Sequence, residues 1–209
     1  MNKKNQITTL VEEQCPDMII LSETFLYDFE AVATKFSYLN YSSSYSRDVN
    51  SNRGGGVLIL VNDTRNDCTF ESIDITKYSR QHIFEASCTK IKFRKLPKCI
   101  YVIGLYRPPK YENFDEFISL LFEVLLQLNS VVTSIIIASD FNKDLSPNSK
   151  QSYLKTQLID VLSCHNIDRL ISQTTRETAM SKTCIDNFGV SKNSCKSETS
   201  IIKCSISDG

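Results

Sequence analysis

Hydrophobic residues recur along this chain in two patterns, one typical of buried strands and one typical of amphipathic helices. Apolar runs rich in β-branched residues predict strands, and residues 82–93 alternate well enough to predict another. Apolar residues three and four positions apart predict helices. The expected strands are 18–21, 57–61, 82–93, 98–106 and 135–137, with shorter ones at 183–188 and 200–204, and the expected helices are 6–14, 113–129 and 151–164.

The order of these elements favours one fold class. Strands first follow one another and then alternate with helices, which favours an α/β sandwich of sheets flanked by helices. Residues 40–53 are rich in Ser, Asn and Tyr and are expected to form an exposed loop. No repeat, linker or low-complexity block divides the chain, so residues 1–209 are expected to form a single domain.

Charge and cysteine content narrow the class of protein. The 24 basic and 24 acidic residues balance, so no global basic field indicates a nucleic-acid partner. No run approaches the ~18 apolar residues of a membrane helix, and no membrane contact is expected. The eight cysteines are scattered and form no CxxC pair, which argues against a disulfide framework and a zinc site. We expect them to be reduced and mostly buried in an intracellular protein.

Acidic and amide side chains follow the predicted strands. Asp140 and Asn142 come after one apolar run, and Glu23 follows an earlier run in the same way. Residues two apart on a strand point to the same face, so Asp140 and Asn142 are expected to aim together beyond the strand's end. A single acid at such a place is usually a solvated turn residue, and only the repetition, continued by Asp186 and Asp208, favours a site. Because Mg²⁺ needs one or two carboxylates besides water and phosphate, Glu23 and Asp208 would suffice as ligands.

Cationic and hydroxyl side chains near other segment ends suit a phosphate backbone. Arg53 precedes three glycines that would let backbone approach a phosphate. These glycines lack the lysine of a phosphate-binding P-loop, so nucleotide hydrolysis is not supported. Taken alone, the glycine segment is better explained as the flexible start of a strand, and a plain turn also explains the Tyr-Arg-Pro-Pro segment. The candidate substrate-binding residues are Arg53, Arg107, Thr175, Arg176 and Thr183, with the phenol of Tyr106 beside them.

Seven segments, taken in order, cover nearly the whole chain: Pro16–Leu26, Arg53–Val57, Gly104–Pro109, Ser139–Asn142, Thr175-Arg176, Thr183–Asp186 and Ser207-Asp208. Each segment is weak evidence alone, but together they resemble the endonuclease domain of non-LTR (LINE-type) retrotransposons. That domain belongs to the endonuclease/exonuclease/phosphatase superfamily. The resemblance implies a DNase I-like four-layer α/β sandwich, in which two packed mixed β-sheets are flanked by helices.

The resemblance also implies a chemistry and a role for each site residue. In the family, Mg²⁺ (or Mn²⁺) assists cleavage of a DNA phosphodiester bond. The nick primes a reverse transcriptase to which the domain is normally fused, and this substrate implies nuclear localisation. By resemblance, Glu23 is the metal ligand, Tyr106 contacts the scissile phosphate, Asp140 orients or deprotonates the attacking water, Asn142 positions the phosphate, Asp186 orients the family's catalytic histidine, and Asp208 is the aspartate of the terminal Ser-Asp-His motif.

The chain departs from the family pattern at both ends. Gly209 stands where the family has histidine, and no reverse transcriptase follows. The family's first strand, which carries a catalytic asparagine, is not found before the predicted helix 6–14. Ser139 replaces a glycine, which is a milder change. We therefore expect a sandwich that lacks its first and last strands, impaired activity, and self-association through open strand edges.

Other interpretations of the sequence stay open. One is a non-catalytic nucleic-acid-binding remnant that keeps Arg53, Tyr106, Arg107 and Arg176 for phosphate contact. Another is a phosphatase or exonuclease of the same superfamily, although the Tyr-Arg-Pro-Pro turn favours the retrotransposon type. A further one is a translated gene fragment with no role.

Overall fold

The structure is a computed structural model, and it describes residues 3–26, 41–46, 55–62, 64–80, 82–109, 113–128, 133–147, 149, 152–178, 180–192 and 197–201. The helices are α1 (Lys3–Gln14), α3 (Phe114–Leu128) and α4 (Ser152–Cys164), with a 3₁₀ turn η1 (Thr76–Tyr78). The strands are β1 (Met18–Leu21), β2 (Tyr41–Ser46), β3 (Val57–Asn62), β4 (Cys68–Ile73), β5 (Glu85–Phe93), β6 (Cys99–Tyr106), β7 (Thr133–Asp140), β8 (Ile167–Arg169), β9 (Arg176–Glu177), β10 (Lys182–Thr183) and β11 (Asp186–Ser191).

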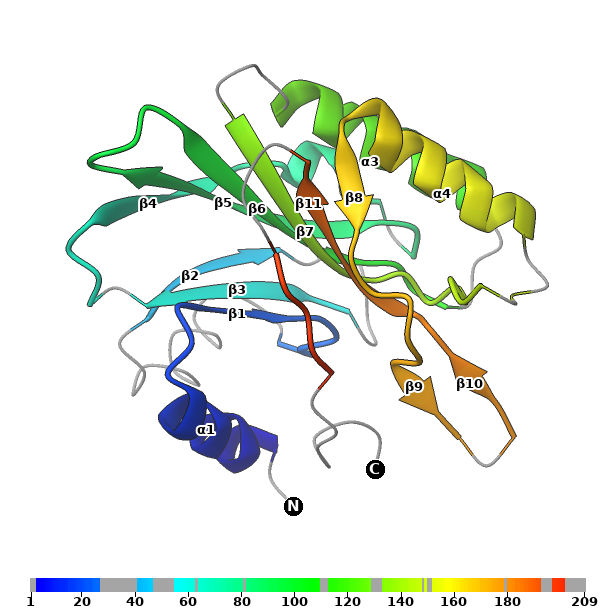
Figure 1. Ribbon diagram of the computed structural model, residues 1–209, viewed down its shortest axis with the longest axis horizontal. Coiled ribbons are helices and arrows are strands. Elements are labelled where there is room, and N and C mark those ends of the chain that lie inside the picture. The colour runs from blue at the N-terminus through cyan, green and yellow to red at the C-terminus, as the bar shows by residue number, and fades with distance from the viewer. Residues whose placement is uncertain are drawn as a thin grey trace.

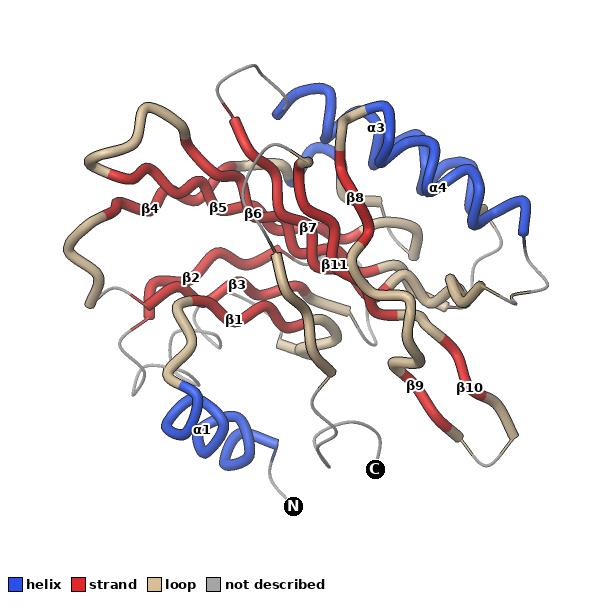
Figure 2. Tube along the Cα trace, in the orientation of Figure 1, coloured by secondary structure: helices blue, strands red, loops and turns tan. Residues whose placement is uncertain are grey.

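These elements stack in four layers, drawn as a ribbon in Figure 1 and by element type in Figure 2. The helix α1 lies outside a three-stranded antiparallel sheet of order β1-β3-β2, called here the small sheet. The large sheet has the order β4-β5-β6-β7-β11-β8, and α3 and α4 cover its far side. Its strands β6 and β7 are parallel and connected through α3, because parallel neighbours need a crossover. The expected α/β sandwich is therefore confirmed.

Side chains along β3 point alternately to the two faces of the small sheet, so this strand contributes to a hydrophobic cluster on each face. Leu58 and Leu60 pack with Ile7 of α1. Ile59, between them, packs with Val102 of β6 in the space between the two sheets. All five residues of the run Val57–Val61 are buried, which explains its unbroken apolar sequence.

The helix α3 shows how the outer layer is specified. Asn113 Oδ1 accepts the Glu116 N–H at 3.3 Å, and Asn113 Nδ2 donates to the Glu116 carboxylate at 2.6 Å, so the helix start is capped. Burial of a side chain such as Leu121 stabilises by about 1.5–3 kcal/mol relative to leaving it exposed. The buried face consists of Phe114, Phe117, Leu120, Leu121, Val124, Leu125 and Leu128.

Some sequence expectations fail at particular elements. An exposed loop is wrong for Tyr41–Ser46, which pair with β3 over six positions, because pairing with a strongly apolar strand overrides a weak local preference. The mixed pattern of β4 predicts no strand, yet this edge strand pairs with β5. The strand expected over 183–188 is interrupted, since β10 ends at Thr183 and β11 begins at Asp186. Of the strand expected over 200–204, residues 200 and 201 belong to no strand, and the rest lie outside the described residues.

Two other expectations concern membrane spans and the state of the cysteines. Among the helices that the structure describes, none is both long and apolar enough to cross a membrane. The cysteines within the described ranges are free thiols, and Cys68, Cys88 and Cys184 are buried.

Candidate active site

Four polar residues form one row across the large sheet. The ladder registers place Glu85 of β5 beside Tyr106 of β6, Tyr106 beside Asp140 of β7, and Asp140 beside Asp186 of β11. Side chains that are neighbours in register project to the same face of a sheet. This face packs toward the small sheet. Sheet pairing therefore brings together residues that lie far apart in the sequence.

Glu23 reaches this row from the end of the small sheet. It directly follows the bend after β1, and its carboxylate accepts a hydrogen bond from the Tyr106 hydroxyl. Glu23 and Phe25 have φ angles of 52° and 54°, in the left-handed region that non-glycine residues rarely adopt. The N–H groups of Thr24 and Phe25 donate to the carbonyl oxygens of Gly56 and Gly55 at 3.2 and 3.0 Å, which holds the bend in place.

The electrostatics of the row centre on Asp140. Burial raises the pKa of its carboxyl to about 7, and the nearby carboxylates of Asp186 and Glu23 add to the rise. The Asn142 N–H, 2.9 Å from Asp140 Oδ1, opposes it. Burial and the hydrogen bond to Glu23 likewise raise the pKa of Tyr106, so its hydroxyl stays protonated. Such a cluster of carboxylates attracts cations and can supply a base near neutral pH.

Hydrogen bonds fix the loops that follow β6 and β7. The Arg107 N–H donates to the Asp140 carbonyl at 3.0 Å, and Asn142 Nδ2 donates to the Arg107 carbonyl at 2.8 Å. The Phe141 N–H donates to the Ile185 carbonyl at 2.9 Å, which ties the same loop to the segment before β11. The predicted residues Asp140, Asn142, Tyr106 and Asp186 thus lie together.

The short hairpin of β9 and β10 carries three of the predicted substrate-binding residues. Thr183 pairs with Arg176 in the ladder. Thr175 Oγ1 accepts the Asp186 N–H at 3.1 Å, so this hydroxyl helps to position the start of β11. Arg176 is exposed, and its positive charge opposes the rise that burial causes in the pKa of Asp140. In Figure 1 the hairpin projects away from the sandwich at the start of β11.

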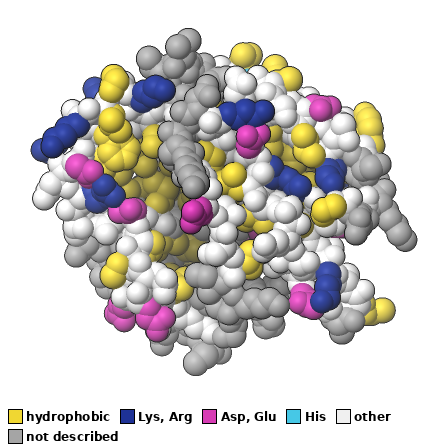
Figure 3. All heavy atoms as spheres, in the orientation of Figure 1, with side chains coloured by type: hydrophobic (Ala, Val, Ile, Leu, Met, Phe, Trp, Pro, Cys, Tyr) yellow, Lys and Arg dark blue, Asp and Glu magenta, His cyan; other side chains and the backbone are white. Residues whose placement is uncertain are grey.

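A pocket of about 140 Å³ lies beside the row, between the two sheets. Its lining includes Ile20 and Ser22 from the small sheet side and Ser139, Asp140 and Asp186 from the large sheet. Figure 3, in the orientation of Figure 1, shows hydrophobic side chains through the middle of the molecule, with charged side chains of both signs around them. Among the described residues on the side shown, lysines and arginines are scattered and not gathered into one patch.

One predicted substrate contact, Arg107, is almost fully covered. It is only 2% exposed, and its guanidinium lies over the ring of Phe114, the first residue of α3, at 5.4 Å. Two other predicted residues, Arg53 and Asp208, lie outside the described residues.

Sequence reasoning missed two carboxylates, Asp144 and Glu85, of which Glu85 belongs to the row. Asp144 Oδ1 accepts the N–H groups of Ser146 and Cys184, both at 3.0 Å, and so joins the loop after β7 to the segment before β11. The pattern Asp-x-Ser after a strand, typical of a local side-chain turn, is a signal that could have indicated it. Glu85 is the other, and its inward position in an alternating strand is the signal that was available.

The donor atoms of this site suit a hard cation. Within the described ranges, no group of three or more His, Cys, Asp or Glu side chains is arranged to hold a metal by itself. Mg²⁺ usually takes only one or two protein carboxylates and completes its shell with water and phosphate. Glu23, with Asp140 and Asp186 near it, fits a partial shell of this kind.

Comparisons with known proteins establish the fold. No family model and no curated protein matches the chain by sequence. The endonuclease domain of TRAS1, a telomere-specific non-LTR retrotransposon, matches with a TM-score of 0.66 and 10% identity, over 91% of this chain and 80% of that one. D. rerio TDP2 complexed with single-strand DNA product matches with a TM-score of 0.64 and 14% identity, over 93% and 79%. A mannosyl-6-phosphatase of Bacteroides thetaiotaomicron matches with a TM-score of 0.67 and 15% identity, over 91% and 77%.

These structures share the DNase I-like fold of endonuclease/exonuclease/phosphatase proteins, and this chain has that fold. The resemblance drawn from the sequence is therefore confirmed at the level of fold. Because the identities are 15% or less, the likeness shows the fold alone.

Proposed function

We propose that this chain is a divalent-metal-dependent endonuclease that hydrolyses a phosphodiester bond of DNA, of the non-LTR retrotransposon type. The observation that supports it most is the convergence of Glu23, Tyr106, Asp140 and Asp186, brought together from four separate segments. The ordered series of motifs that resembles the retrotransposon endonucleases, and the likeness in fold to the TRAS1 domain, support the DNA substrate.

Each residue of the site has a proposed task. Glu23, with the predicted ligand Asp208, would hold Mg²⁺ or Mn²⁺, which neutralises charge developing on the phosphate when it is bound. Asp140 would accept a proton from the attacking water, since its pKa of about 7 makes it a base near neutral pH. Tyr106, whose hydroxyl donates to Glu23 in the free protein, would turn its hydrogen to a phosphate oxygen when substrate binds. Asn142 would fix the orientation of Asp140 through its backbone N–H.

Contacts to the DNA backbone are proposed for the hairpin of β9 and β10. Arg176 is exposed there and close enough to Asp140 to affect its pKa, so a phosphate held by Arg176 would lie near the row. Thr183 is next to Arg176 in the ladder and Thr175 lies beside both. Cleavage of chromosomal DNA would require nuclear localisation.

Two other functions are favoured by specific observations. Gly209 stands where the retrotransposon endonucleases have histidine, which favours weak cleavage or DNA binding without cleavage. The mannosyl-6-phosphatase matches this fold as well as the TRAS1 domain does, which favours hydrolysis of a phosphate monoester.

The test is nicking of supercoiled plasmid with Mg²⁺ or with EDTA. We expect metal-dependent nicking that falls by about 10²–10⁴-fold in Asp140→Ala, because one positioned base is removed. The matched control is Asp160→Ala, which removes an exposed carboxylate of α4 and should nick like the unmodified chain. Equal nicking by both variants would contradict the assignment of Asp140. Salt-dependent DNA binding without nicking would favour the binding function, and hydrolysis of p-nitrophenyl phosphate alone would favour the phosphatase.

A further inference from the structure

The carboxylate of Glu85 is buried at the site but has no task in the reaction described above. Glu85 begins β5, stands beside Tyr106 in the ladder, and is 2% exposed. Its Oε2 accepts the backbone N–H of Gly56 at 2.5 Å. Burial of a carboxylate is costly unless hydrogen bonds compensate for the lost water. The hydrogen bond from the Gly56 N–H therefore compensates for part of the cost of burying Glu85 beside the site.

The backbone that Glu85 contacts is the segment Gly55-Gly56, called the turn below, and its conformation strongly favours glycine. Gly55 and Gly56 have φ angles of 84° and 94°, in the region where a side chain is strained. A Cβ atom on Gly55 would also lie 2.4 Å from Glu85 Oε1, so the carboxylate rests directly against the backbone. Charge-assisted hydrogen bonds of this type are about twice as strong as neutral ones. Glu85 therefore fixes the position of the turn.

The same turn holds the segment that carries Glu23. The carbonyl oxygens of Gly56 and Gly55 accept the N–H groups of Thr24 and Phe25, the two residues that follow Glu23. Glu23 itself has a strained φ of 52°, and such a conformation persists only when its surroundings enforce it. Two sets of hydrogen bonds hold Glu23 in this conformation. The turn accepts the N–H groups of Thr24 and Phe25, and the Tyr106 hydroxyl donates to the Glu23 carboxylate.

We propose that Glu85 is a positioning residue for Glu23, acting through the turn at Gly55 and Gly56, and that it sets the affinity of the site for a divalent cation. This inference rests on the proposed function, in which Glu23 is a metal ligand. It accounts for Gly55 and Gly56 of the Arg-Gly-Gly-Gly segment without a contact between them and phosphate. Loss of a residue that orients a metal ligand typically lowers metal affinity or activity by about 10–100-fold.

The experiment compares Glu85→Gln and Glu85→Asp with Thr89→Val. The first variant removes the charge, and the second keeps the charge on a side chain too short to reach Gly56. Thr89 is the matched control, because it is 3% exposed on the same face of β5 and its hydroxyl has no hydrogen-bond partner. Mn²⁺ binding is followed by electron paramagnetic resonance. The Gly56 amide is followed by NMR after labelling the six glycines with ¹⁵N.

Positioning predicts that both Glu85 variants move the Gly56 amide signal and weaken Mn²⁺ binding and nicking by about 10–100-fold, while Thr89→Val stays within about twofold of the unmodified chain. Full Mn²⁺ binding in Glu85→Asp, with loss only in Glu85→Gln, would show a charge effect and overturn the positioning role. Mn²⁺ binding retained in both variants would overturn it as well. An unmodified chain that binds Mn²⁺ but does not nick would contradict the proposed function alone, whereas one that fails to bind Mn²⁺ would contradict both.

Discussion

The two sheets of this sandwich place their share of the site in different ways. Tyr106, Asp140 and Asp186 lie on neighbouring strands of the large sheet, where continuous ladders and a core shared with α3 and α4 fix their positions. Glu23 follows the short strand β1 of the small sheet, in a strained bend held by a turn. The difference teaches that register alone can assemble a site, but a residue beyond a strand's end needs separate support.

The largest expected effect comes from replacing Asp140, which the strand register of the large sheet places in the site. Asp140→Asn should lower nicking by about 10²–10⁴-fold while making the chain more stable at pH 8. The pKa of Asp140 is raised from 3.8 to about 7 in the folded protein, so folding has to bury its charge above that pH. The folded state therefore binds the proton more tightly than the unfolded state, and stability falls as pH rises from about 4 to 7. The gain in Asp140→Asn at pH 8 should be about 2–4 kcal/mol.

Urea denaturation in EDTA measures this difference at several pH values. The two proteins should converge only below about pH 3, where Asp140 is protonated in both the folded and the unfolded state. A variant less stable than the unmodified chain at pH 8 would show that the ionised carboxylate stabilises the large sheet. Register alone would then not be enough to place Asp140.

The next effect compares the cores of the two halves. Leu121 of α3 and Leu60 of β3 are both almost fully buried, but Leu121 belongs to the large cluster under α3 and α4, and Leu60 belongs to a small cluster against α1. Replacement of a buried leucine by alanine costs about 2–5 kcal/mol, and the cost is lower where the surroundings can collapse into the cavity. Leu121→Ala should lie near the top of this range and Leu60→Ala near the bottom. Urea unfolding gives both values, and an equal or greater cost at Leu60 would show that the small sheet is packed as tightly as the large one.

The same contrast explains how much the sequence could predict. The strands β1, β3 and β7 were predicted because unbroken apolar runs require burial on both faces, and α3 because of its regular spacing. Asp140, Tyr106 and Asp186 could be proposed for one site because each is near a strand's end. The row that they form with Glu85 could not be predicted, because it depends on the pairing register, which arises from contacts between distant segments.

The errors at the site have the same origin. Arg107 was proposed as a phosphate contact because a guanidinium can hydrogen-bond phosphate, and no sequence pattern indicated that the start of α3 packs over it. The partners of Asp144 and Glu85 include Cys184 and Gly56, which lie 40 and 29 residues away in the chain. No local pattern shows a hydrogen bond of that kind, and β2 was missed for the same reason.

A smaller effect concerns the charges within the row. Asp186→Asn should lower the pKa of Asp140, because the Asp186 carboxylate is, after burial, the main cause of its rise. The rising limb of the pH–rate profile for plasmid nicking should therefore move to lower pH. Burial remains in the variant, so the pKa should stay above 3.8. A profile that does not move would mean that the limb reports another group, and Asp140 would lose its proposed role as the base.

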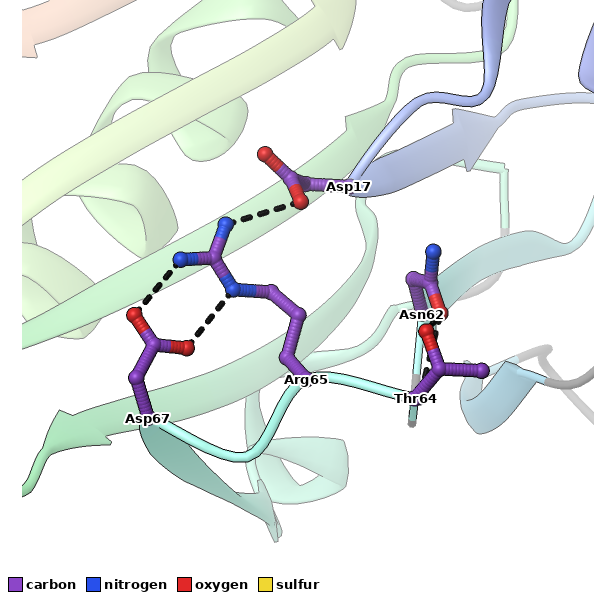
Figure 4. Close-up of polar contacts among 5 residues, drawn as sticks. All are labelled: Asp17, Asn62, Thr64, Arg65 and Asp67. Atoms are coloured by element: carbon purple, nitrogen blue, oxygen red, sulfur yellow. Dashed lines mark hydrogen bonds and ion pairs between the residues drawn. The ribbon is translucent and has the colours of Figure 1, made fainter.

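The smallest effect tests a polar contact between the two sheets. Arg65 donates to Asp17, just before β1, at 2.8 Å, and to Asp67, just before β4, at 2.9 and 2.6 Å (Figure 4). Hydrogen bonds from Arg65 hold the pKa of Asp67 at about 2, so their contribution to stability is present above pH 4 and is lost as pH falls toward 2. Because these side chains are exposed, Arg65→Met should lower the melting temperature only slightly, and the difference should vanish at pH 2 or in about 1 M salt. A large loss that persists in high salt would show that this contact, and not the apolar core between the sheets, holds the small sheet against the large one.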